Sequence, residues 1–204
     1  FQRVSQIPPQ SRGEFSRILL PVPELEAHLE ELSAEKERLA AVLPRFLFDS
    51  EGEFLPRLKK LREQGVAALF CDNAAHIALG REAGMELLGG PFLNLTNSLA
   101  LAEAETLGIA AAVVSVEEKL DDMRALRAGI PLGAAVYGSL PLMAVRSCPV
   151  KAQLGCAKCG RKGFVTDRKG ISFPVRCDYD KSASFLYNAV PLEMSDRVRE
   201  LEFL

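Results

Sequence analysis

The stretch that decides the fold is VAALFCDNAAHIALGREAGMELLGGPFLNLTNSLALAEAETLGIAAAVVS, residues 66–115. Three runs in it are apolar at nearly every position, and the two polar-patterned segments between them end at Gly84 and Gly108. Runs that are apolar throughout are typical of parallel strands covered on both faces, and glycine is the usual residue just after a helix. The stretch therefore predicts three parallel strands joined by two helices.

The same alternation extends in both directions along the chain. Markers of the predicted strands recur every 20 to 23 residues, at Leu47, Phe70, Leu93, Val113 and Val136. Six strands are predicted, at residues 17–22, 44–48, 66–71, 85–95, 109–115 and 130–137. The leucine stripe of residues 23–43 predicts one long helix between the first two strands. Units of this length predict an α/β fold, in which the (βα) repeat forms a TIM-barrel-like or partial-barrel parallel sheet.

The pattern changes after Val145, where helical periodicity stops and Gly, Pro and basic residues become frequent. The segment GFVTDRKGISFPVRCD predicts a β-hairpin with its turn at residues 167–170, and the final SDRVRELEFL predicts a short helix. We therefore expect a linker or disordered segment at 1–14 and a βα-repeat, barrel-like domain at 15–145. A Cys-rich, metal-binding β-hairpin appendage with a C-terminal helix is expected at 146–204.

Polar residues follow each predicted strand, and the carboxyl ends of parallel strands form the ligand-binding face of such sheets. The predicted ligand-binding residues are Asp72, Asn73, Asn94, Asn97, Ser115, Glu117 and Tyr137. Asn and Ser are also preferred helix N-caps, so capping is the alternative for Asn73, Asn97 and Ser115. Asn94 lies inside the apolar run FLNL and is harder to explain as a cap.

Composition places the chain among ordinary globular proteins and bounds its partners. With 204 residues, 48% hydrophobic and 25% charged, it is neither disordered, collagenous nor disulfide-dense. No run of about 18 uncharged apolar residues is present and the start lacks a signal-peptide pattern, so we expect a cytoplasmic protein without a membrane partner. The first residue, Phe1, and the Pro/Gln/Ser/Arg stretch after it predict that further domains precede this segment.

Four of the five cysteines lie close together in the sequence, as Cys148, Cys156, Cys159 and Cys177. Two thiolates two residues apart, as in CAKCG, can hold one metal, and four soft ligands are the number that zinc or a four-iron cluster requires. The alternatives are four buried thiols or a redox dithiol at Cys156 and Cys159. Cys71, in contrast, is predicted to be a core thiol, and His28 and His76 to be surface residues.

Positive charge gathers in the same window. Although the net charge of the chain is −2, residues 146–181 contain nine Lys or Arg and three Asp. Phe164, Phe173, Tyr179 and Tyr187 alternate with these cations as possible stacking surfaces. RNA contact is predicted for Arg161, Lys162, Arg168 and Lys169; the alternative is that the cations offset thiolate charge or solvate a hairpin.

Several strings in this region resemble one known family. VYGSLPLMAVRSCPVK, GCAKCG, FVTDRKGISFPVRC and LYNAVPLEMSD are similar to the C-terminal region of peptidase family U32, the collagenase-like proteases. The resemblance covers the chain from about Arg45 onward and includes LNLTNSLALAEAETLGIAAAVVSVEE. Better understood members resemble oxygen-independent hydroxylases with a four-cysteine iron–sulfur cluster in a barrel and prephenate as oxygen donor. Long members modify a cytidine of 23S ribosomal RNA.

The resemblance implies that this chain is the C-terminal part of such a protein. It would contribute a four-cysteine site, holding a [4Fe–4S] cluster or zinc, and an RNA-binding face, with the main catalytic unit in an absent N-terminal U32 domain. The chain alone is then expected to be inactive. The alternatives are a structural zinc and RNA-binding module, and a collagenase-like peptidase. The sequence contains no HExxH motif and no Ser/His/Asp set for the last of these.

Overall fold

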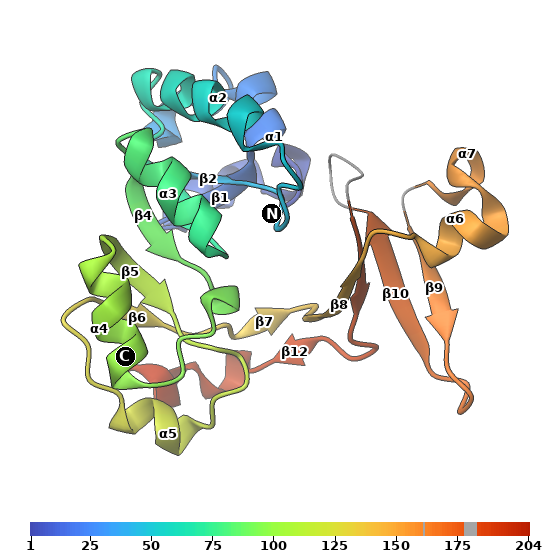
Figure 1. Cartoon of the computed structure of the whole chain (residues 1–204). Helices are drawn as coiled ribbons and strands as arrows, with labels where there is room; N and C mark the ends of the chain where they lie inside the picture. Colours follow the sequence, from blue (N-terminus) through green and yellow to red (C-terminus); the bar gives the residue numbers. More distant parts are fainter. Residues whose placement is uncertain (161, 178–182) are drawn as a thin grey trace. The chain divides into compact units, whose positions relative to one another are not determined.

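The computed structural model describes residues 1–160, 162–177 and 183–204 (Figure 1). The chain forms two compact units, which are treated separately below. Unit 1 comprises Phe1–Ala135 together with Phe203–Leu204, and unit 2 comprises Val136–Glu202. Arg161, one of the predicted RNA-contacting residues, and Tyr179 lie outside the described residues.

Unit 1 is built on a six-stranded parallel sheet whose strands follow one another in chain order, β1-β2-β3-β4-β5-β6. The strands are β1 (Ile18–Pro21), β2 (Leu39–Val42), β3 (Ala68–Cys71), β4 (Glu86–Gly89), β5 (Ile109–Val113) and β6 (Leu132–Gly133). A doubly wound sheet reverses its strand order at a switch point. Because this order never reverses, right-handed crossovers put the helices on one face of the sheet. The mixed α/β fold is consistent with part of an α/β barrel.

Helices alternate with these strands, as the periodicity predicts. The α-helices are α1 (Val22–His28), α2 (Glu51–Glu63), α3 (Ala74–Glu82), α4 (Ser98–Thr106) and α5 (Leu120–Ala125). Short 3-10 helices are η1 (Val4–Gln6), η2 (Pro9–Glu14), η3 (Ser33–Arg38) and η4 (Pro91–Leu93). Gly84 and Gly108 have φ angles of 68° and 93° just after α3 and α4, a backbone conformation that favours glycine. They end the helices as predicted.

The second strand and the helix before it differ from prediction. The predicted strand at 44–48 is wrong: the strand is β2, at Leu39–Val42, and residues 23–43 are not one helix because α1 ends at His28. Leu39 and Ala40 are fully buried. A short run that is apolar on both faces suits a central parallel strand better than a helix end. Phe46 and Phe48 instead lie at the surface, with their ring centroids 5.6 Å apart.

The core of unit 1 is one continuous apolar cluster that includes residues from the sheet, the helices and the N-terminal segment. Leu20, Leu58, Leu69 and Leu101 are fully buried in it. The predicted linker at 1–14 contributes to this cluster through Ile7 and Val4, whose backbone N–H donates to a Glu24 carboxylate oxygen at 3.0 Å. These first residues therefore pack as part of unit 1.

Unit 2 contains a four-stranded antiparallel sheet in the order β8-β11-β10-β9, and a separate two-stranded pair. The sheet strands are β8 (Pro141–Val145), β9 (Lys162–Thr166), β10 (Ser172–Cys177) and β11 (Ser184–Tyr187). Two short helices, α6 (Pro149–Leu154) and α7 (Cys156–Cys159), lie between β8 and β9 in the chain, and η5 (Ser195–Leu201) follows the last strand. The pair joins β7 (Tyr137–Gly138) to β12 (Leu192–Glu193), the first and last strands of the unit.

The division between the units falls at Ala135, ten residues before the predicted boundary. Residues 141–145 form β8, which pairs with β11, so their partners lie about 40 residues later in the chain. No local pattern indicates such a pairing. Unit 2 is also more than a hairpin appendage, because β9 and β10 are the outer half of a larger sheet.

No helix in the described ranges combines the length and apolar character needed to cross a membrane.

Candidate metal centre

The four clustered cysteines come from three parts of unit 2. Cys148 is the residue just before α6, Cys156 and Cys159 are the first and last residues of α7, and Cys177 ends β10. The φ angles of 72° at Gly155 and 54° at Gly160 suit glycine and let the chain turn sharply before and after α7. These turns bring a knuckle of two cysteines back toward the strands.

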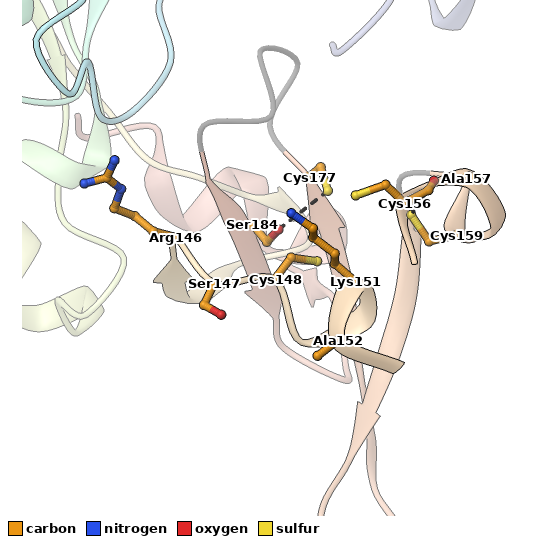
Figure 2. Close-up of a pocket in the computed structure, with 11 residues that line it drawn as sticks. Arg146, Ser147, Cys148, Lys151, Ala152, Cys156, Ala157, Cys159, Cys177 and Ser184 are labelled. Atoms are coloured by element: carbon orange, nitrogen blue, oxygen red, sulfur yellow. Dashed lines mark hydrogen bonds between the residues drawn. The ribbon is translucent and has the colours of Figure 1, made fainter. Parts of the chain in front are cut away.

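All four cysteines line a single cavity of about 640 Å³. Figure 2 shows their side chains around this space, with Arg146 directed away from them. Lys151 and Ser184 also line the cavity. Ser184 begins β11 and lies directly opposite Cys177, with 3.5 Å between its hydroxyl oxygen and the Cys177 sulfur. The fold thus gathers four thiols, a hydroxyl and an ammonium group.

The environment shifts the pKa values of two of these thiols in opposite directions. Burial alone would raise the pKa of Cys148, but hydrogen bonds from Ser184, from the backbone of Lys151 and Val150 and from Cys177 outweigh burial and lower it. Burial raises the pKa of Cys177, and the neighbouring Cys148 and Cys159 add to this while the Ser184 hydrogen bond opposes it. Cys148 therefore loses its proton more readily than Cys177, and the thiolate is the form that binds metals.

The four cysteine thiols are ligands of the type that thiophilic metals prefer. Zinc and iron–sulfur clusters both take four cysteine thiolates. Across the described residues, however, no three His, Cys, Asp or Glu side chains are arranged to hold a metal ion as they stand. The sulfurs surround the cavity without converging on one point, so binding a metal requires that they move inward. Cys156 is exposed and sits on a four-residue helix, which leaves it free to do so.

The predicted strand-end residues divide into caps and a small polar cluster. Asn73 and Asn97 are N-caps of α3 and α4: their side-chain oxygens accept from the backbone N–H of His76 and Ala100 at 3.0 and 2.9 Å. Asn94 and Ser115 come together, with the Ser115 hydroxyl donating to the Asn94 amide oxygen at 2.9 Å.

Three further strand-end predictions have different surroundings. The Glu117 backbone N–H donates to the Ser115 hydroxyl, while Glu117 itself is exposed. Tyr137 belongs to β7 of unit 2 and is 71% exposed. Asp72 follows β3, and its carboxyl oxygen Oδ1 is buried without a hydrogen-bond partner among the described residues. Burial raises the Asp72 pKa to about 6, against the opposing effect of the Arg45 guanidinium.

His76 is not a surface residue, contrary to prediction: it is 1% exposed. Its Nδ1 accepts the backbone N–H of Asp72 at 3.2 Å, and its Nε2 lies 3.0 Å from the Pro44 carbonyl oxygen. Burial lowers the His76 pKa to about 4, so the ring is neutral near pH 7. Sequence reasoning also missed Ser184, whose only signal was its place at the start of the run SFLYNAV. Cys71 is fully buried, as predicted, and burial raises its pKa to about 12.

The described cations predicted to contact RNA lie on or beside the β9–β10 hairpin. Lys162 begins β9, and Arg168 and Lys169 occupy the turn between the strands; all three are exposed. The Asp167 carboxylate accepts from the backbone N–H groups of Lys169 and Ile171, at 2.8 and 2.9 Å. This acid is therefore engaged with the backbone of the turn and leaves the two cations pointing into solvent.

Comparison with known proteins gives no match to a family model, to a curated protein or to a solved structure.

Proposed function

We propose that this chain is the C-terminal part of a U32-family protein of the cytoplasm. In this proposal unit 1 forms part of a TIM-type barrel, and unit 2 holds a cysteine-bound metal centre and presents a basic face to RNA. The reaction served is the prephenate-dependent, oxygen-independent hydroxylation of a ribosomal RNA cytidine. The observation that carries the metal centre is the single cavity lined by Cys148, Cys156, Cys159 and Cys177. The family and the reaction rest on the sequence resemblance described above.

An iron–sulfur cluster is the first candidate for this centre. The cavity of about 640 Å³ is large compared with one ion, and its four thiols match the Cys₄ ligation of a [4Fe–4S] cluster. Such a cluster supplies one-electron redox chemistry when bound. The chain's own residues would ligate it and hydrogen-bond the sulfurs, as Ser184 does for Cys177.

Structural zinc is the second candidate, and the α7 knuckle favours it. Cys156 and Cys159 are separated by two residues and lie at the ends of one turn of helix, which is the ligand spacing of many zinc sites. In that case unit 2 would be an RNA-binding module without redox chemistry of its own.

Peptidase activity, the third possibility, has weaker support from the geometry. His76 contacts Asp72, Asn73 and the Pro44 backbone, and His28 lies 3.3 Å from Glu31. The buried thiol of Cys71 is neutral, because its pKa is raised to about 12. A nucleophile activated by histidine would need a Ser or Cys beside one of these rings.

The test is metal analysis of protein purified without oxygen. We expect about four irons and about four acid-labile sulfides per chain. The C156S and C159S variants should lose the metal, whereas C71A, which alters a thiol of unit 1, should retain it. One zinc per chain without iron would favour structural zinc over the iron–sulfur cluster. Absence of both metals from the anaerobic protein would overturn the metal centre.

A further inference from the structure

The β9–β10 hairpin has two faces that differ in what covers them. Val175 of β10 packs against Val150 of α6 and Cys159 of α7, and Val165 of β9 lies on the same side. A Cβ placed on Gly163 would lie 2.6 Å from the Val150 side chain, so α6 sits directly over this strand. Because successive residues of a strand point to opposite faces, the remaining residues of β9 and β10 form the other face. We call this the hairpin face; it consists of Lys162, Phe164, Thr166, Ser172, Pro174 and Arg176.

The hairpin face is made of three cross-strand pairs of distinct chemistry. In register, Lys162 lies opposite Arg176, Phe164 opposite Pro174, and Thr166 opposite Ser172. Every member except Pro174 is exposed, and Phe164 is 67% exposed. The Thr166 and Ser172 hydroxyl oxygens lie 3.0 Å apart. A cationic pair, an aromatic ring and a hydroxyl pair thus follow one another along about 15 Å of strand.

The Lys162–Arg176 pair is unfavourable for the fold on its own. Like charges directly opposite each other destabilise a strand pair. Across the part of the chain that the structure describes, neither cation takes part in an ion pair. An anion bound between the two would relieve this repulsion. At the far end of the hairpin, Arg168 and Lys169 carry two positive charges against the one negative charge of Asp167, whose carboxylate accepts backbone N–H groups of the turn.

We infer that the hairpin face binds single-stranded RNA, with a backbone phosphate between Lys162 and Arg176 and an unpaired base stacked on Phe164. This deepens the proposed function, on whose RNA-facing role for unit 2 it rests, by naming the face and the strandedness of the RNA. An exposed ring beside cations on a sheet is the arrangement that proteins use to stack unpaired bases along a phosphate backbone. The Thr166 and Ser172 hydroxyls supply hydrogen bonds to ribose on the far side of the ring.

The observations favour RNA over other anionic partners. An acidic peptide would satisfy the cationic pair but would leave the Phe164 ring in water. A paired RNA helix would bring phosphates to the cations, but its bases are stacked internally and cannot cover the ring. Of these three partners, an unpaired polynucleotide is the one that supplies both a phosphate for the cations and a free aromatic plane for the ring.

The test measures binding of the full chain, purified without oxygen, to a labelled single-stranded oligoadenylate of about 12 nucleotides. F164A should weaken binding about tenfold, whereas F164W, which keeps a stacking ring, should bind at least as tightly as the parent protein. K162A and R176A should each lower the slope of log affinity against log salt by about 0.7. K60A, which removes an exposed cation from α2 of unit 1, is the matched control and should change neither quantity. Metal content is measured for each variant.

The outcomes separate this inference from the proposed function. Loss of affinity in F164A, K162A and R176A at unchanged metal content supports the hairpin face. Binding that depends on Arg168 and Lys169 but not on Phe164 would overturn the inference and leave RNA contact at the turn. Equal affinity for a duplex of the same length, or for polyglutamate, would overturn it in favour of a nonspecific cationic patch. No RNA affinity in protein with a full metal complement would overturn it while the metal centre stands.

Discussion

The two units bury apolar side chains on very different scales. Unit 1 has a continuous core that runs from Val4 to Ala112 and includes strands, helices and the N-terminal segment. In unit 2 the corresponding cluster contains three buried residues, Val150, Cys159 and Val175, with Cys148, Val165 and Leu186 partly buried beside them. Ala183, Phe185 and Leu201 of unit 2 are buried as well. Small folds with cores of this size are commonly supplemented by a metal or a disulfide. Unit 1 is therefore held by hydrophobic burial, and the metal proposed at the four cysteines would supplement the smaller core of unit 2.

The largest expected effect is that of removing the proposed metal, which should affect unit 2 and not unit 1. Structural metal contributes on the order of 10 kcal/mol to small modules, so chelation of the full chain should unfold unit 2 and leave unit 1 folded. Hydrogen exchange measured by mass spectrometry would detect this as lost protection in β9, β10 and β11 with retained protection in β1 to β5. The C71A variant, treated in the same way, is the control for thiol loss in unit 1. Retained protection of β10 in the chelated chain would contradict the expectation that a metal stabilises unit 2.

A cavity in the unit 1 core should instead destabilise unit 1 and leave unit 2 unchanged. Leu69 in β3 is fully buried, and L69A should lower the free energy of unfolding of unit 1 by about 2 to 5 kcal/mol. L99A removes the same atoms from a side chain that is 84% exposed and should change stability by less than about 0.5 kcal/mol. Denaturant unfolding followed by circular dichroism, with metal content as the readout for unit 2, measures both. Metal loss in L69A would show that the units are not independent.

The pH dependence of unit 1 should be set by two neighbouring buried groups with opposite effects. Burial raises the Asp72 pKa to about 6, so its contribution to stability is full below about pH 4 and is lost as pH rises through 6. Burial lowers the His76 pKa to about 4, so its contribution is full above about pH 6.5 and is lost as pH falls through 4. Between pH 4 and 6 the two trends offset each other in the parent protein.

In the D72N variant, the dependence of stability on the protonation of His76 should become measurable, because the opposing effect of Asp72 is gone. With the carboxyl replaced by a neutral amide, the free energy of unfolding should rise by about 3 kcal/mol between pH 4 and 6.5. Urea denaturation at a series of pH values measures this slope. D122N, at an exposed position on α5, is the control and should keep the flat profile of the parent. A flat profile in D72N as well would contradict the assignment.

The smallest expected effect concerns the like-charge pair of unit 2. Without RNA, K162A or R176A should leave the metal-loaded unit as stable as the parent or more stable by up to about 0.5 kcal/mol, because each removes a cross-strand repulsion. Hydrogen exchange of β9 and β10 at low and high salt measures this, and the gain should shrink as salt screens the pair. A clear loss of stability would mean that the cations support the hairpin structurally.

The sequence predicted the repeating part of the fold and missed what depends on distant partners. Five of the six parallel strands and the helices α2, α3 and α4 follow from apolar runs and from glycines such as Gly84 and Gly108. The strand at Leu39–Val42 was hidden because LAAV also continues the leucine stripe of a helix. Only its place beside β1 and β3 in the sheet makes it a strand.

The candidate site was predictable in composition and not in detail. The spacing of the four cysteines indicated one site, and all four line one cavity. Ser184 could not be assigned to that cavity, because its contact with Cys177 depends on the register between β10 and β11. His76 was misassigned to the surface because its two ring contacts involve backbone atoms of Pro44 and Asp72. Backbone partners leave no pattern in a sequence.

The short β7–β12 pair also determines which segment of unit 2 could be transplanted into another protein. It pairs Gly138 with Leu192 and Tyr137 with Glu193, so the two ends of the segment 137–193 lie side by side, while the unit itself continues to Glu202. A segment whose two ends lie side by side can be inserted into a surface loop of an unrelated host protein, because neither the segment nor the loop must change conformation to join them. The segment 137–193 contains all four clustered cysteines, so it could be transplanted as an insert into a carrier of known stability, where metal analysis would test the proposed centre apart from unit 1.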